Sequence, residues 1–208
     1  MFAKAKSLGI YGMDAFSVVV EADLSRGLPR FDIVGLPDTA VKESRERVRA
    51  SIKNCKYDFP VSRITVNIAP ADIKKEGPLY DLPILIAVLA ATGQIKAQIA
   101  DYAFVGELSL DGEIRPCTGV LPMLLKAREQ GIPAVFIPYG NKTEAGAVNG
   151  IDVFAAKNIG EVIRHISGEE KLPPCFTPLS KLATYDDTLD FADVKGQGDA
   201  KRALEIAA

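Results

Sequence analysis

The longest apolar run of the chain, from Leu82 to Ala91, most constrains what the sequence can fold into. It is about half as long as the ~20 residues that a helix needs to cross a bilayer, so a membrane span is not expected. Pro83 is typical of a first helical turn, and Gly93 is typical of the residue that follows a helix. The run therefore predicts a helix buried in a globular core.

Shorter periodic segments surround this helix. Strand-like runs cluster first and then alternate with helices, which predicts the α+β class, with a two-layer α/β sandwich and a mixed sheet rather than a doubly wound one. Asp38 and Asn158 are suited to cap the helices that follow them, and Asp111-Gly112 predicts a hairpin turn. The expected strands are 16–22, 30–34, 63–68, 102–108, 113–115, 134–138 and 151–154, and the expected helices are 39–54, 82–92, 120–130, 142–148 and 159–167.

The character of the chain changes after residue 168. We predict one domain over residues 1–168, a proline-containing linker over 169–189, and the start of a further domain over 190–208, in which Asp199 caps a helix. The sequence stops inside this predicted helix without a C-cap, so we expect it to be a piece cut from a longer protein.

Composition bounds the function classes. Hydrophobic residues make up 48% and charged residues 25% of the 208 residues, which is typical of an ordered globular protein. The formal net charge of −2 excludes a polycation that binds nucleic acid through bulk charge, although local basic patches remain possible. Three widely spaced cysteines and the lack of a secretory signal favour reduced thiols and a cytoplasmic location.

The predicted helix over 39–54 carries a candidate nucleic-acid contact. Arg45, Arg49 and Lys53 are spaced by four residues and form one stripe, as phosphate-binding arrays do. An ordinary charged face, with Glu43 paired to Arg47, is the alternative. The interleaved glutamates, and the expectation that no exposed aromatic ring is available for base stacking, favour that alternative.

Two lysines precede the predicted buried helix. Lys74 and Lys75 are candidates for contacts with phosphate or with an ATPase ring, and a solvated loop is the alternative because lysines usually remain exposed. Asp72, Glu76 and Asp81, which lie around these lysines, fit capping and loop hydrogen bonds better than a catalytic carboxylate pair. His165 is the only histidine and has no second ligand candidate nearby, so no metal site is predicted.

Several strings resemble a known family. LPRFDIVGLPDTAVKESRERVRASIKN (28–54), RITVNIAPADIKKEGPLYDLPI (63–84) and FVGELSLDGEIRPCTGVLPM (104–123) resemble the N-terminal module of the ComM/YifB family of magnesium-chelatase-like AAA+ ATPases. DFADVKGQGDAKRALEIA (190–207) is similar to the segment before the Walker A loop of these proteins. The resemblance implies a ribosomal protein S5 domain 2-like fold, shared with the Lon protease domain.

For the full-length protein, the resemblance implies an ATPase that uses ATP and Mg²⁺, assembles as a homohexameric ring with its own AAA+ domain and neighbouring subunits, and remodels DNA in branch migration and natural transformation. No membrane partner is implied. Val194, Gly196 and Gln197 resemble the element that lies against adenine. The GxxxxGK[ST] loop is absent from these 208 residues, so we expect no bound cofactor and no ATP hydrolysis here.

The Lon-like resemblance raises the possibility of a peptidase, which needs a serine activated by a lysine. The serine of that family follows a Gly-Pro pair, and here Leu79 follows Gly77-Pro78. Leu121 stands at the position of the lysine. Hydrocarbon side chains cannot attack a carbonyl or accept a proton, so we expect no catalytic residues. A stand-alone nucleic-acid-binding domain and a magnesium chelatase subunit for porphyrin remain as further alternatives.

Overall fold

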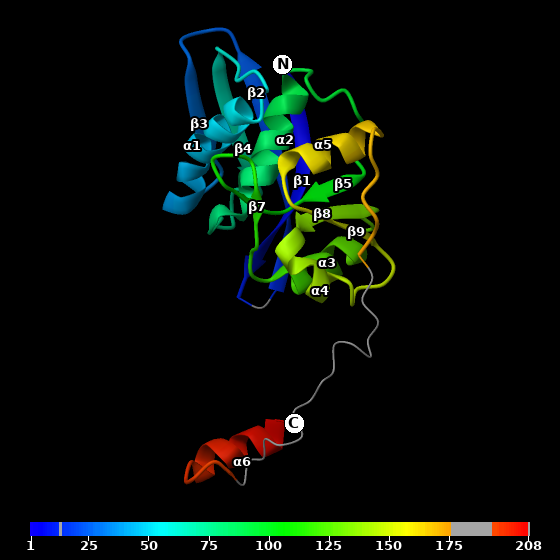
Figure 1. Cartoon of the computed structure of the whole chain (residues 1–208). Helices are drawn as coiled ribbons and strands as arrows, with labels where there is room; N and C mark the ends of the chain where they lie inside the picture. Colours follow the sequence, from blue (N-terminus) through cyan, green and yellow to red (C-terminus); the bar gives the residue numbers. More distant parts are fainter. Residues whose placement is uncertain (13, 176–192, 208) are drawn as a thin grey trace. The chain divides into compact units, whose positions relative to one another are not determined.

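The computed structural model describes residues 1–12, 14–175 and 193–207, which belong to two compact units, Met1–Thr177 and Pro178–Ala208 (Figure 1). A seven-stranded sheet in the order β3-β4-β2-β1-β5-β8-β9 forms the framework of the first unit. A two-stranded ribbon of β6 and β7 lies apart from it. The strands are β1 (Phe2–Tyr11), β2 (Asp14–Ser25), β3 (Arg30–Val34), β4 (Arg63–Ala69), β5 (Tyr102–Phe104), β6 (Glu107–Leu108), β7 (Ile114–Arg115), β8 (Ala134–Pro138) and β9 (Asp152–Ala156).

Strand directions make the sheet mixed, as the sequence predicts. β2 pairs antiparallel with β1 on one side and with β4 on the other. The remaining pairs in the sheet, β3 with β4, β1 with β5, β5 with β8 and β8 with β9, are all parallel. Antiparallel pairing is therefore confined to the two neighbours of β2, and the pairs on either side of them are parallel.

Helices cover the sheet and bury two apolar clusters. The helices are α1 (Thr39–Asn54), α2 (Asp81–Ala91), α3 (Val120–Glu129), α4 (Lys142–Ala145), α5 (Ile159–Ser167) and, in the second unit, α6 (Gly198–Ala207). One core cluster contains residues of α1, α2 and α5, and the other contains residues of α3 and α4. Neighbouring residues of β5 separate the clusters, since Phe104 belongs to the first and Ala103 to the second. The predicted α/β sandwich with a Lon-like mixed sheet is confirmed.

The predicted buried helix and helix caps are also confirmed. Every residue of α2 except Ala90 is buried. The Asp38 carboxylate accepts a hydrogen bond from the Val41 N–H at 2.7 Å, at the start of α1. The Asn158 side chain accepts one from the Glu161 N–H at 3.0 Å, at the start of α5. These short polar side chains satisfy backbone donors that a helix leaves free at its N-terminus.

The central strand β1 is absent from the sequence-based prediction. Its alternating alanines and lysines have low strand propensity, so no strand signal arises. Small residues are required on the side that faces α2: a Cβ atom at Gly9 would overlap the Tyr80 hydroxyl and the Phe16 ring. On the same side, the buried Ser7 hydroxyl donates to the Phe104 carbonyl at 2.8 Å. Close packing, rather than propensity, therefore selects the residues of this strand.

The single strand predicted over 102–108 is wrong, because the chain leaves the sheet after β5. The Gly106 N–H donates to the Leu79 carbonyl at 2.9 Å, and the Gly106 carbonyl accepts from the Leu82 N–H at 3.1 Å. A Cβ atom here would lie 2.6 Å from the Ile114 side chain, so only glycine fits at the observed φ of 158°. Gly106 thereby connects the sheet to the start of α2.

A buried ion pair joins α1 to α2. The Arg47 guanidinium donates to both carboxylate oxygens of Asp81, at 2.6 and 3.1 Å. Asp81 is fully buried and also accepts the Leu108 N–H at 3.1 Å. Burial raises the pKa of Asp81, opposed by these hydrogen bonds, while the bond to Asp81 raises the pKa of Arg47. The expected partner Glu43 lies farther from Arg47, at 3.8 Å, so Asp81 is the partner that matters.

Residues beyond the predicted domain end at 168 still pack on the first unit. The Cys175 N–H donates to the Val153 carbonyl at 2.7 Å, and Pro174 forms an isolated bridge with Phe154 of β9. Residues 176–189 of the predicted linker and 190–192 of the predicted next domain lie outside the described part of the chain, and the boundaries at 168 and 189 stay predictions. Of the helices in the described residues, none is both long and apolar enough to cross a membrane.

We predict that Arg47→Met destabilises the fold by about 3 kcal/mol, because it leaves the buried Asp81 carboxylate without its cation. The measurement is the free energy of unfolding from urea titration. Arg45→Met is the matched control, because Arg45 pairs with Glu46 at an exposed site and its loss should change stability by less than about 1 kcal/mol. Adding Asp81→Leu to Arg47→Met should restore part of the stability. If Arg47→Met and Arg45→Met lowered the free energy of unfolding equally, a stabilising role of the ion pair between Arg47 and Asp81 would be contradicted.

Candidate nucleic-acid interface

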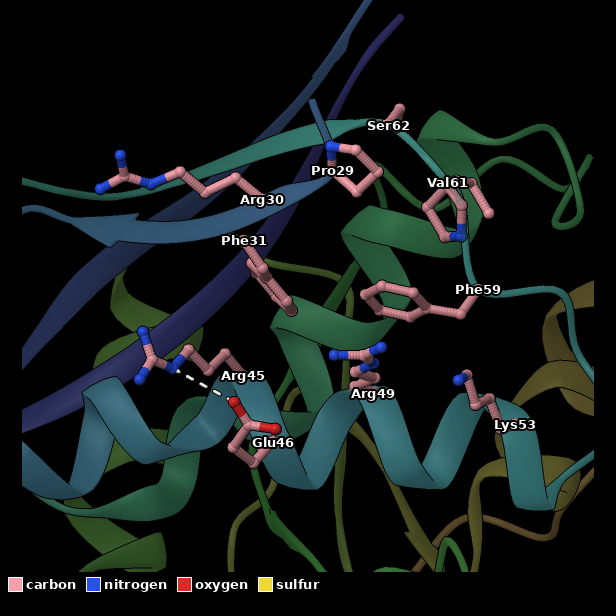
Figure 2. Close-up of a pocket in the computed structure, with 11 residues that line it drawn as sticks. Pro29, Arg30, Phe31, Arg45, Glu46, Arg49, Lys53, Phe59, Val61 and Ser62 are labelled. Atoms are coloured by element: carbon pink, nitrogen blue, oxygen red, sulfur yellow. Dashed lines mark ion pairs between the residues drawn. The ribbon is translucent and has the colours of Figure 1, made fainter. Parts of the chain in front are cut away.

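A cleft of about 290 Å³ lies between α1 and β3 (Figure 2). Three segments form its walls: residues 29–31 at the start of β3, one face of α1, and the loop over 59–62 that leads into β4. These segments are separated in the sequence and meet because β3 and β4 are parallel neighbours in the sheet while α1 connects them. The cleft is therefore a product of the fold.

The wall formed by α1 carries the three cations that the sequence singles out. Arg45, Arg49 and Lys53 extend from the same side of α1 toward the cleft, as Figure 2 shows. Arg45 pairs with Glu46 at 3.4 Å. Within residues 1–12, 14–175 and 193–207, no carboxylate lies within ion-pair distance of Arg49 or Lys53. Two cations of the stripe thus retain uncompensated charge.

A fourth cation, Arg30 of β3, lines the opposite wall. It pairs with Asp32 at 2.7 Å, two residues along the same strand. Its position next to the stripe depends on the packing of β3 over α1, so no sequence spacing could have placed it there.

The inner part of the cleft is aromatic. The rings of Phe31 and Phe59 contact each other, with centroids 6.0 Å apart and planes tilted by 40°. The Arg49 guanidinium lies 5.6 Å from the centroid of Phe59, which is cation–π distance. Both phenylalanines are half-buried rather than exposed, but each contributes part of its ring to the lining of the cleft. Phe59 lies in an irregular loop, where no periodicity marks it.

The two loop lysines differ from each other. Lys74 is exposed and pairs with Glu76 at 2.8 Å. Lys75 is fully buried, and its ammonium donates to the Ile73 carbonyl at 2.7 Å. Burial lowers the pKa of Lys75. The expectation of an exposed loop is wrong for Lys75. Because its buried ammonium cannot reach a phosphate, Lys75 is no longer a candidate for a nucleic-acid contact.

The two positions at which the Lon-like resemblance would place a serine and a lysine are occupied by leucines. Leu79 lies in the 3₁₀ turn Pro78–Tyr80 and packs against both core clusters. Leu121 is the second residue of α3 and is 39% exposed. Neither side chain offers a nucleophile or a proton acceptor.

In the second unit, the proposed adenine-side residues Val194, Gly196 and Gln197 are exposed in the segment before α6. The predicted cap Asp199 lies inside the first turn, because α6 begins at Gly198. A nucleotide contact by these residues stays a prediction.

His165 packs in the core of the first unit. It is buried against Phe136 and Phe154, with ring centroids 5.1 and 4.2 Å away, and its Nδ1 accepts the Leu172 N–H at 3.0 Å. In the part of the chain that the structure describes, no group of three or more His, Cys, Asp or Glu side chains could hold a metal ion.

Comparison with known proteins identifies the family. Residues 20–141 match the family model described as subunit ChlI of Mg-chelatase. This chain belongs to that family. It is 41% identical to competence protein ComM of Haemophilus influenzae over 201 residues, and 40% identical to the uncharacterized protein YifB of Escherichia coli over 200 residues. Each match covers 95% of this chain, but 39% of ComM and 38% of YifB. The chain spans about two fifths of the length of these relatives.

The sequence is also similar to Lon proteases. The chain is 28% identical to Lon protease of Mycolicibacterium smegmatis over 171 residues, covering 76% of this chain and 22% of that protease. This similarity agrees with the observed mixed sheet and its helices.

We predict that acid destabilises the first unit through His165. Burial lowers the pKa of its imidazole below the usual 6.5, so the fold favours the neutral ring. That stabilisation is fully present above pH 6.5 and is lost as the pH falls through the lower pKa of the folded state. Urea titrations should be made above pH 6.5 and below the lower pKa of His165 in the folded state. Between these two conditions, the unfolding free energy of His165→Gln should decrease less than that of the wild type. The chain has one histidine, so an unchanged pH dependence would contradict this assignment.

Proposed function

We propose that this chain is the non-catalytic N-terminal module of a ComM-like ATPase that remodels DNA, and that the wall of α1 contacts the DNA backbone. The observation that carries the proposal is the pair of unpaired cations, Arg49 and Lys53, on one face of a cleft. Phosphate binding by such side chains releases counterions, which favours association at low salt. Because the whole chain has a net charge of −2, a local patch of this kind is what could make contact.

The rest of the activity belongs to the whole protein. We propose that ATP and Mg²⁺ bind to an AAA+ domain that follows this module, with Val194, Gly196 and Gln197 bordering the nucleotide. In this proposal six copies form a ring in the cytoplasm, and the module holds or steers DNA while the ring uses ATP. The name of ComM, a competence protein, supports a role in natural transformation, in which branch migration would be the remodelling step.

A second candidate is a magnesium chelatase subunit that acts on a porphyrin, favoured by the name of the matching family model. That model matches residues 20–141, which lie within this module, so the module by itself does not separate the two candidates. The two candidates differ in what should stimulate ATP hydrolysis by the full-length protein: DNA for the first, and a porphyrin together with partner subunits for the second. A full-length protein that neither binds DNA nor responds to it would contradict our proposal.

We predict that Arg49→Gln/Lys53→Gln weakens DNA binding by the 208-residue chain. The slope of log affinity against log salt concentration should fall by about 0.7 to 0.9 for each phosphate that the variant no longer neutralises. Fluorescence anisotropy over a series of salt concentrations measures both quantities. Lys42→Gln/Lys56→Gln is the control, because it removes the same charge from exposed positions that do not line the cleft. Equal effects of the two double variants would exclude the cleft as the site of DNA binding.

A further inference from the structure

We propose that the cleft between α1 and β3 binds a single strand of nucleic acid, with an unpaired base stacked on Phe31 and Phe59 and its phosphates on Arg49 and Lys53. This inference rests on the proposed DNA contact and adds a contact with the base. It assigns a role to two phenylalanines that backbone binding alone does not need.

The accessibility of the rings is the first step. Phe31 and Phe59 pack against the core cluster on one side and line the cleft on the other, where Figure 2 shows both rings above α1. Because the rings contact each other at 6.0 Å, a base cannot enter between them. It must lie on the surface that they present to the cleft. The neighbouring Val61 is 87% exposed, so the apolar surface continues to the rim.

The position of the cations is the second step. The Arg49 guanidinium lies over the Phe59 ring, 5.6 Å from its centroid, so a positive charge forms part of the proposed stacking surface and leaves the Phe31 ring as the more open part of it. Lys53 follows four residues later, about 6 Å farther along the helix axis. A strand that lays one base on the rings can therefore place neighbouring phosphates along α1. Base stacking combined with a cationic groove is how proteins bind single strands without reading their sequence.

The size of the cleft is the third step. A volume of about 290 Å³ admits a group of the size of a nucleotide but cannot enclose a duplex, so a duplex could contact the cations of α1 without placing a base on the rings. In a duplex the faces of each base are also covered by its neighbours, so no face is free to stack on a protein ring. An unpaired base has a free face, and every base can use it because stacking is tolerant of sequence. The cleft therefore favours a single strand.

The test compares three labelled ligands by fluorescence anisotropy with the 208-residue chain. These are an oligothymidylate, an abasic strand of equal length that keeps the phosphates, and a duplex. Phe31→Leu/Phe59→Leu keeps apolar side chains but removes the aromatic faces, and a urea titration verifies its fold. We expect this variant to lose about tenfold in affinity for oligothymidylate, with no change for the abasic strand or the duplex. Arg49→Gln/Lys53→Gln should weaken binding to all three ligands.

The outcomes separate the two proposals. If the phenylalanine variant loses affinity equally for all three ligands, or for none, the base contact is overturned while the phosphate contact stands. If the Arg49→Gln/Lys53→Gln variant binds all three ligands like the wild type, the proposed DNA contact itself fails. Free thymidine monophosphate should compete only at a much higher nucleotide concentration than unlabelled oligothymidylate. Equal competition would overturn the strand assignment and identify a site for free nucleotides.

Discussion

The ion pair between Arg47 and Asp81 determines how α1 faces the rest of the protein. Asp81 is the first residue of the buried helix α2, so a charge at this position requires a partner that reaches into the core. Arg47 is that partner, and its direction fixes the rotation of α1 about its axis. With Arg47 and the apolar stripe directed inward, Arg49 and Lys53 necessarily lie on the side that faces β3. The candidate site thus depends on an interaction that does not belong to it.

A second carboxylate, that of the half-buried Asp38, organises the loop before α2. Asp38 caps α1, accepts the Gly77 N–H at 3.1 Å through its other oxygen, and donates its own N–H to the Lys75 carbonyl at 3.0 Å. These hydrogen bonds connect the start of α1 to the turn that contains Leu79 and leads into α2. The loop before α2 is therefore held in place by the residue that caps α1.

Local signals made part of this structure predictable. The stripe and cap of α1 and the apolar run of α2 identify both helices, because each signal lies within a few residues. The ion pair between Arg47 and Asp81 joins residues 34 positions apart, and the sequence around neither residue predicts it. The same holds for the cleft: spacing along α1 predicts the cations, but the rings come from β3 and from an irregular loop. Strand β1 was missed because tight packing required small residues there instead of typical strand formers.

The composition of the cleft also bears on how a motor could use it. Two unpaired cations and one small aromatic surface offer few contacts, so a single module should bind a strand weakly and release it quickly. In the proposed ring, several modules would act on one strand, and the high effective concentration would convert weak contacts into useful avidity. A single tight site would instead oppose movement of the strand. Weak binding in each copy is therefore what a steering module requires, and a cleft on a net acidic chain supplies it.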